Sequence, residues 1–313
     1  MGFLSLKSEC DRWVRTDSLI AIAAITAMGI SAPVVAQERL PNAIEIAQSP
    51  AQQQAIDRLN QGLQLVQNNR IPEAIVAFRE AARLDPFLAP AHYNLGLSLR
   101  QIGQIQPAAE AFAQAIRVDA DFALAYANLG ALMLETNNLE QATVYLERAI
   151  ELDDELGVAY YNLGLVQGQQ GLIDEAIDTL EKATRYSPNA PEPTYHLGRM
   201  YVLQGKIRSA KSAFRKAIEI NPRYAEAHYQ LGATLLNEEK LEDALESFRQ
   251  AVEVSPRYAN AYYGAGLAFI GLNRPSEALR VLQYARELYR EQGNTQWVEQ
   301  TDRLLQQIRG NRE

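Results

Sequence analysis

The sequence predicts an all-α solenoid of repeated helix–turn–helix segments, and three observations lead to this fold class. Glycine recurs every 34 residues. Alanine and large apolar residues keep fixed distances from each glycine. Apolar residues within each repeat also follow the three- and four-residue spacing of amphipathic helices, first in one short segment and then in a second. The seven glycines are Gly62, Gly96, Gly130, Gly164, Gly198, Gly232 and Gly266.

The N-terminal residues 1–36 are predicted to be a signal peptide. Basic side chains occur within residues 1–18, an apolar stretch follows over 19–31, and small residues lead to Ala36. This order is typical of a secretory signal that is cut after Ala36. The alternative is that residues 19–36 remain uncleaved and anchor the chain to a membrane. In both cases we expect an exported protein, periplasmic or otherwise extracytoplasmic.

The repeats are predicted to occupy residues 55–292, after a linker at 37–54 that is rich in Gln, Pro and Ala. Small residues allow two helices to cross closely, and a Phe or Leu between two alanines fills the remaining space. Proline cannot continue the helix before it, and it restricts the backbone of the residue that precedes it. The chain is therefore expected to turn where a proline follows a helix. Six repeats end in a small polar residue: Asp85, Asp119, Asp153, Ser187, Asn221 and Ser255.

The junction at residues 221–232, NPRYAEAHYQLG, resembles that of the tetratricopeptide repeat (TPR) family, whose period is also 34 residues. The resemblance covers seven repeats over residues 55–292 and implies a right-handed superhelix whose concave groove holds extended peptides. Ala120 and Asp154 depart from the pattern, because proline is expected at both positions.

Residues 293–313 are predicted to form a C-terminal capping helix and tail. Gly293 is a typical helix stop, and Asn294 or Thr295 can cap a last helix that reaches about Ile308. A solenoid needs such a helix to cover its last exposed apolar face. The residues expected on its buried side are Trp297, Leu304, Leu305 and Ile308.

Composition argues against several classes of function. The formal charge is −8, from 30 basic and 38 acidic residues, and no dense basic run suggests nucleic-acid binding. One cysteine and three histidines leave little material for a metal centre. No nucleophile elbow or phosphate-cradling loop is present, so we predict neither an enzyme nor a cofactor.

The candidate binding residues lie on the first helix of each repeat, numbered so that its recurring glycine is position 8. Positions 2, 5, 6, 9, 12 and 13 share one face of that helix. Tyrosine at position 5 offers apolar area with a polar tip, and asparagine at position 6 offers both a donor and an acceptor. The predicted peptide-binding residues are Tyr93, Asn94, Asn128, Tyr161, Asn162, Tyr195, Tyr229 and Tyr263.

These observations favour a scaffold that binds peptide segments of other proteins and helps to assemble or stabilise a complex. Two alternatives remain at this stage. The chain could be a non-catalytic subunit of a cell-envelope enzyme complex, or a solenoid that binds a small ligand or glycan. The tyrosines and asparagines could also be structural, with each asparagine bonding a neighbouring helix. Membrane contact is expected only if the N-terminal segment stays uncleaved.

Overall fold

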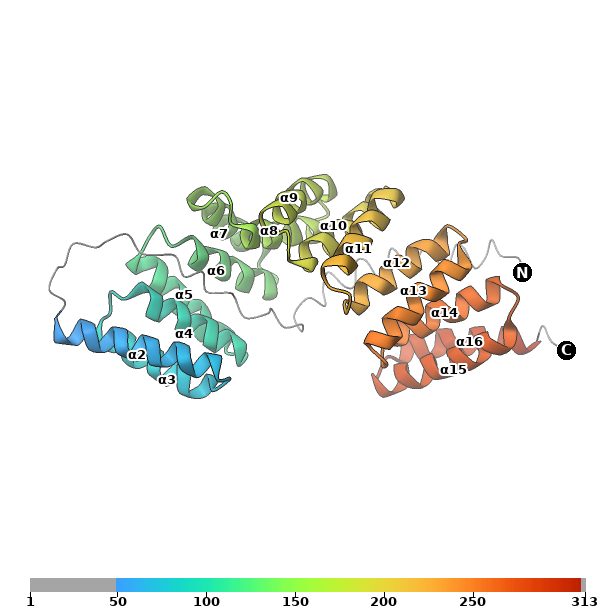
Figure 1. The fold of residues 1–313 in the computed structure, drawn as a ribbon, viewed down its shortest axis with the longest axis horizontal. Helices are drawn as coiled ribbons and strands as arrows, with labels where there is room; N and C mark the ends of the chain where they lie inside the picture. The colour runs from blue at the N-terminus through green and yellow to red at the C-terminus, as the bar shows by residue number, and fades with distance from the viewer. Residues whose placement is uncertain (1–48, 311–313) are drawn as a thin grey trace. The chain divides into compact units, whose positions relative to one another are not determined.

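The computed structural model describes residues 49–310, and within this range it contains only α-helices and no strands (Figure 1). The described residues form two compact parts, which we call the N-terminal subdomain (49–166) and the C-terminal subdomain (167–310). The predicted signal peptide or anchor at 1–36 lies outside the described residues. None of the described helices is long and apolar enough to cross a membrane.

The helices follow one another in pairs, as the 34-residue period predicts. The helices that open the repeats are α2 (Pro50–Gln67), α4 (Ala89–Gln101), α6 (Ala123–Glu135), α8 (Gly157–Gln169), α10 (Pro191–Gln204), α12 (Ala225–Asn237) and α14 (Ala259–Gly271). Their partners are α3 (Ile71–Leu84), α5 (Ile105–Val118), α7 (Leu139–Leu152), α9 (Ile173–Tyr186), α11 (Ile207–Ile220), α13 (Leu241–Val254) and α15 (Pro275–Glu291). The last helix is α16 (Thr295–Gly310). Seven helix pairs and one additional helix therefore make an all-α repeat solenoid.

The recurring glycines allow the two helices of a repeat to touch. A Cβ atom placed on Gly96 would lie 2.6 Å from Cε1 of Phe112, and one on Gly130 would lie 2.6 Å from Cγ of Leu146. Phe112 and Leu146 are completely buried. A side chain at the glycine would therefore displace the residue that fills the core, which confirms the predicted close crossing.

An aspartate or asparagine that follows the second helix closes several of the turns between repeats. The Asp119 carboxylate accepts a hydrogen bond from the Asp121 backbone N–H at 3.1 Å. Asp85 and Asp153 make the same bond to the residue two positions later, at 3.0 and 3.1 Å. Because this side-chain bond closes the turn by itself, the same turn forms at Ala120, where proline is missing.

The first helix begins before residue 55, where the first repeat is predicted to start. Helix α2 starts at Pro50, so residues 50–54 are helical and do not belong to the linker predicted at 37–54. The Ser49 hydroxyl accepts the Gln52 backbone N–H at 3.2 Å, and the Gln52 side chain accepts the Ser49 N–H at 2.9 Å. This reciprocal capping box, followed by proline at the first helical position, fixes the start of the helix.

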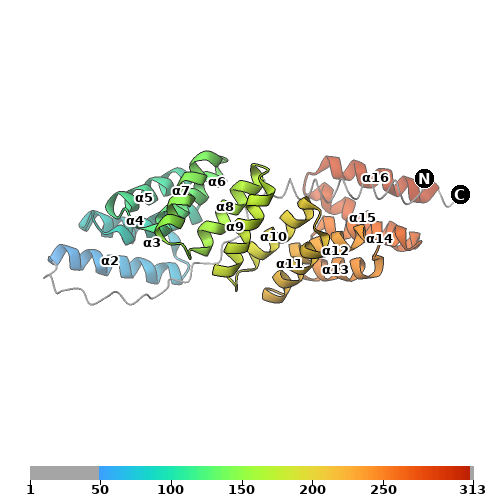
Figure 2. The same cartoon turned by 90° about the horizontal axis from the view of Figure 1, so that it is seen from above.

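The predicted capping helix is present as α16, and it lies against α15 in both views (Figures 1 and 2). Gly293 adopts the left-handed conformation, with φ 72°, that ends the preceding helix. The Trp297 ring lies 5.2 Å from Tyr263 and 5.5 Å from Tyr289 between centroids. Leu304, Leu305 and Ile308 are buried against the same core. Helix α16 thus covers the apolar face that the last repeat would otherwise expose.

Candidate functional site

Four of the five tyrosines predicted to line a groove are buried in the core. The exposed fractions of Tyr93, Tyr195, Tyr229 and Tyr263 are 9%, 6%, 1% and 3%, and Tyr161 is half-buried. These four rings therefore offer little surface to a ligand. Position 5 faces the partner helix, because it lies three residues before the glycine where the two helices cross.

The ring at position 5 joins one repeat to the next. Tyr93 lies 5.8 Å from Phe112 of its own repeat and 4.9 Å from Phe122 in the following turn. Tyr229 is placed in the same way, 6.0 Å from Phe248 and 5.0 Å from Tyr258. These separations suit favourable aromatic pairs, so the tyrosines hold consecutive repeats together.

The asparagines at position 6 bond to their own helices. The side-chain amides of Asn94, Asn128 and Asn162 donate to the carbonyls of Pro90, Leu124 and Val158, at 2.8, 2.9 and 2.9 Å. These amide donors are therefore engaged by their own backbone. Asn94 and Asn128 are half-buried and Asn162 is buried. The asparagines therefore do not form the two-sided ladder of free donors and acceptors predicted for a ligand backbone.

A polar network connects two first helices of the N-terminal subdomain. Asn128 donates to the Tyr93 hydroxyl at 3.2 Å and accepts from Arg100 Nη1 at 3.4 Å. Arg100 also pairs with Glu135, with Nε 3.0 Å from Oε1. Burial raises the pKa of Tyr93 to about 12, and the Asn128 hydrogen bond and the Arg100 charge oppose this shift.

Arg100 and Glu135 were not singled out from the sequence, although both belong to the predicted face. They occupy positions 12 and 13 of consecutive repeats. The available signal was that an arginine and a glutamate of opposite charge stand on the same face one repeat apart. Their side chains are 16% and 23% exposed, so the pair is partly buried, and it connects α4 to α6.

Position 2 differs between the subdomains. In the N-terminal subdomain it is apolar, and Leu124 and Val158 are each 39% exposed. In the C-terminal subdomain it is acidic or polar. The residues at this position, in chain order, are Ile56, Pro90, Leu124 and Val158, followed by Glu192, Glu226 and Asn260. The N-terminal subdomain therefore exposes an apolar row where the C-terminal subdomain does not.

The first helices of the C-terminal subdomain bury their polar residues instead. His196 and Gln230, at position 6, are 6% and 3% exposed, and Arg199 is fully buried. Burial lowers the pKa of His196 well below its usual range, and the neighbouring Arg199 charge lowers it further. The Arg199 guanidinium carbon lies 5.9 Å from the centroid of the Tyr195 ring. These side chains are part of the packing of their own helices.

The other two histidines also have structural positions. Nε2 of His92 and Nε2 of His228 each lie 3.0 Å from a carbonyl oxygen, of Pro86 and Pro222 respectively. Each imidazole therefore ties its helix to the preceding turn. No group of three His, Cys, Asp or Glu residues that could hold a metal ion occurs in the described part of the chain.

Models of the tetratricopeptide repeat match most of the repeat region. One, described as "TPR repeat", matches residues 62–103, 198–238 and 235–272. Two described as "Tetratricopeptide repeat" match residues 158–190 and 93–156. No curated protein matches the chain.

Several solved structures are similar to this chain. YrrB, described as a TPR protein with an unusual peptide-binding site, is 31% identical, with a TM-score of 0.52. The match covers 62% of this chain and 99% of YrrB. PilF of Pseudomonas aeruginosa is 21% identical over 68% of this chain and 97% of its own, with a TM-score of 0.61. PilW, described as a type IV pilus biogenesis factor, is 19% identical over 65% of this chain and 94% of its own, with a TM-score of 0.59.

Proposed function

Because this chain belongs to the tetratricopeptide repeat family, whose members act as protein-interaction scaffolds, we propose that it binds extended peptide segments of partner proteins on its N-terminal subdomain. The observation that carries the proposal is the exposed apolar row at position 2, where Leu124 and Val158 are each 39% exposed. The network of Tyr93, Asn128 and Arg100 borders this row, since the Asn128 amide also donates to the Leu124 carbonyl.

The bound segment would be part of a complex that the protein assembles or stabilises. YrrB, the 31% identical relative, is described by its peptide-binding site, which supports a peptide as the ligand. We propose that the chain itself is not an enzyme. The buried histidine and the arginine beside it serve packing, and the aromatic residues at position 5 join repeats rather than hold a substrate.

Capture of partners with matched variants tests the proposal. The full chain serves as bait in an extract of the cell envelope, and bound proteins are quantified by mass spectrometry. Leu124→Ser combined with Val158→Ser should lose the specific partners. Val144→Ser is the control, because Val144 is 63% exposed but lies on the second helix of its repeat. Overlapping peptides of each captured protein would then locate the bound segment.

The result against the proposal is equally clear. If the double variant remains folded by circular dichroism and retains every partner, the position 2 row does not bind them. Equal loss of partners in the Val144→Ser control would also contradict the proposal, because it would indicate general adhesion to exposed apolar residues.

We also propose that the protein is exported. The basic, apolar and small-residue order of residues 1–36 supports cleavage after Ala36. The N-terminal sequence of the protein recovered from its host should therefore begin at Gln37. Recovery of the uncut chain in the membrane fraction would favour an anchor at residues 19–36, and recovery of the uncut chain in the cytosol would contradict export.

A further inference from the structure

The edge of the N-terminal subdomain where each first helix begins has an unusual composition. In every junction between repeats, the third residue of the turn precedes position 2 by three residues. In the N-terminal subdomain these two positions hold Phe87 and Pro90, then Asp121 and Leu124, then Glu155 and Val158. We call these six residues the turn-edge row. All six are exposed.

The fold does not require this composition. The equivalent pairs in the C-terminal subdomain are Asn189 and Glu192, Arg223 and Glu226, and Arg257 and Asn260. The turns have the same geometry there, since the Asn221 side chain accepts the Arg223 backbone N–H at 3.0 Å, as Asp119 accepts that of Asp121 at 3.1 Å. The apolar and acidic side chains of the turn-edge row therefore need another explanation than the turn itself.

The apolar members of the turn-edge row have large exposed fractions. Phe87 is 83% exposed, and Leu124 and Val158 are each 39% exposed. Single exposed apolar residues are ordinary, but these recur at the same edge of consecutive repeats. A repeated exposed apolar edge with polar borders is typical of an interaction surface.

The acidic members of the turn-edge row are Asp121 and Glu155. Neither forms an ion pair within residues 49–310. By contrast, Arg257, at the equivalent turn position in the C-terminal subdomain, pairs with Glu291 at 2.8 Å. The carboxylates of the turn-edge row thus keep their charge available to a partner.

The charge of the whole subdomain agrees with this local pattern. Residues 49–166 contain fourteen acidic residues, seven arginines and no lysine, which gives a net charge of −7. Residues 167–310 contain eighteen acidic and eighteen basic residues and are neutral overall. A negative potential attracts positively charged segments and repels acidic ones, so the charge of the subdomain selects among peptides.

We propose that the turn-edge row docks an extended partner segment in which lysine or arginine side chains stand among apolar ones. The apolar side chains would contact Phe87, Leu124 and Val158, and the cationic ones would pair with Asp121 and Glu155. The bound segment is expected to be extended, because the turn-edge row runs across three consecutive repeats. One turn of a bound helix would contact only one of these repeats. This inference rests on the proposed function and adds the chemistry of the bound segment.

Selection from a library of random 12-residue peptides displayed on phage tests the inference. The full chain is the immobilised target, and the strongest selected peptide is then made with a fluorophore for polarisation measurements. We expect the selected sequences to be enriched in lysine or arginine and in apolar residues. Replacing the cationic residues of that peptide by glutamate should abolish its binding.

Protein variants assign the binding to this edge. Asp121→Asn with Glu155→Gln should weaken binding of the selected peptide by about 3- to 30-fold at low salt, as two exposed ion pairs would. The loss should shrink at 500 mM salt, because exposed charges are then screened. The matched control is Glu192→Gln with Glu226→Gln, which changes two carboxylates on the corresponding edge of the C-terminal subdomain and should leave affinity unchanged.

The outcomes separate this inference from the function on which it rests. If no peptide is enriched, both the peptide-binding function and the inference fail. If peptides are enriched but lack cationic residues, or bind the Asp121→Asn, Glu155→Gln variant as well as the original chain, only the inference fails. Equal weakening by the control variant would likewise overturn it, because the attraction would then not belong to the turn-edge row.

Discussion

The two subdomains are built on one repeat but use their exposed positions differently. The buried glycine, alanine and Phe or Leu positions are the same in both, as Gly96 with Phe112 and Gly232 with Phe248 illustrate. Position 2 is apolar in the N-terminal subdomain and acidic or polar in the C-terminal one. The third residue of the turn is apolar or acidic in the N-terminal subdomain and polar or basic in the C-terminal one. The repeat therefore determines the residues that pack in the core, whereas the exposed residues at the starts of the first helices can vary with function.

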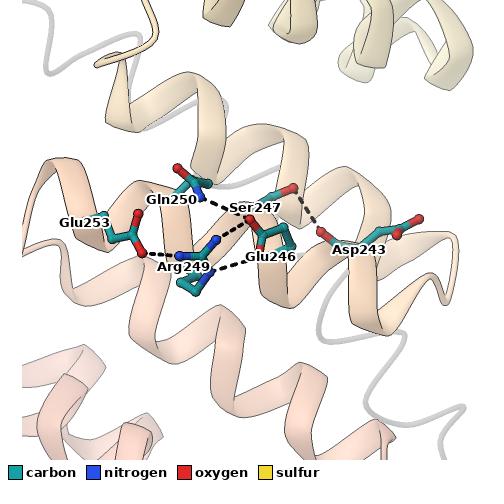
Figure 3. A network of polar contacts seen from close by, with 6 residues as sticks. All are labelled: Asp243, Glu246, Ser247, Arg249, Gln250 and Glu253. Atoms are coloured by element: carbon teal, nitrogen blue, oxygen red, sulfur yellow. Dashed lines mark hydrogen bonds and ion pairs between the residues drawn. The ribbon is translucent and has the colours of Figure 1, made fainter.

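Both subdomains pair exposed charges within their second helices, as Arg83 with Glu80 and Arg249 with Glu246 illustrate. On α13 of the C-terminal subdomain, Arg249 bonds to Glu246 at 2.5 and 2.8 Å and also pairs with Glu253 (Figure 3). The hydrogen bond from Arg249 lowers the pKa of Glu246, and the bond to Glu246 raises the pKa of Arg249. These three exposed charges are thus paired within the helix, unlike those of Asp121 and Glu155.

The largest effect is expected at the C-terminal cap. Leu305→Ala should lower the free energy of unfolding by about 2–5 kcal/mol, because Leu305 is 2% exposed and its truncation leaves a cavity. Trp297 is the only tryptophan after residue 36, so its fluorescence reports this subdomain during urea unfolding. Gln307→Ala, at an exposed position of the same helix, is the control. An unchanged midpoint for Leu305→Ala would show that α16 is not part of the core.

Replacing one glycine by alanine in each subdomain should change the free energy of unfolding in opposite directions. Gly96→Ala should destabilise the protein by about 1–3 kcal/mol, because the new Cβ would lie 2.6 Å from the buried Phe112 ring. Gly168→Ala meets the flexible Met200 side chain, with Sδ at 3.2 Å, and should gain up to about 1 kcal/mol of helix propensity. Urea midpoints of the two variants test this contrast. Equal changes would contradict the crossing geometry.

Much of this fold could be predicted from the sequence, because close packing repeats at fixed positions. The periodic Gly96 and Phe112 revealed the helix pairs, and Gly293 with Trp297 revealed the cap. The start at Pro50 was missed, because the Ser49 capping box lies outside the periodic pattern. The 34-residue period predicts the repeats, but it does not predict an extension of one helix, such as the first turn of α2.

The binding residues were predicted less well. Tyr93 shares a helical face with Asn94, as Tyr229 does with Gln230, but the sequence of one helix does not reveal whether the partner helix covers that face. The asparagine donors were assigned to a ligand, although the carbonyl four residues earlier is always within their reach. The difference in net charge between the two subdomains can be predicted from the sequence, if the charged residues of each subdomain are counted separately.

Two partly buried ion pairs should contribute equally in the two subdomains. Arg100 pairs with Glu135 in the N-terminal subdomain, and Lys211 pairs with Glu238 in the C-terminal one. Double-mutant cycles with Arg100→Gln and Glu135→Gln, and with Lys211→Gln and Glu238→Gln, should each give a coupling of about 1–3 kcal/mol. Negligible coupling in either cycle would show that its pair is only a surface contact.

A smaller, pH-dependent effect is expected in the C-terminal subdomain. Because the pKa of His196 is lowered, the unfolded chain binds a proton below about pH 6.5 while the folded chain does not. Stability should therefore fall as the pH drops, by at most about 1.4 kcal/mol from this group between pH 6.5 and 5.5. His196→Gln, which copies the buried Gln230 of the next repeat, should show a weaker dependence in urea titrations at these two pH values. An identical dependence would contradict the proposed origin.

Photo-cross-linking of a bound peptide tests the contrast between the subdomains most directly. The strongest phage-selected peptide, carrying a benzophenone at its centre, is bound to the full chain, irradiated, and the attached residues are identified by mass spectrometry. We expect attachment within residues 87–162, at the starts of α4, α6 and α8 and in the turns before them. Attachment mainly within residues 189–271 would contradict it, because the C-terminal subdomain would then carry the binding surface.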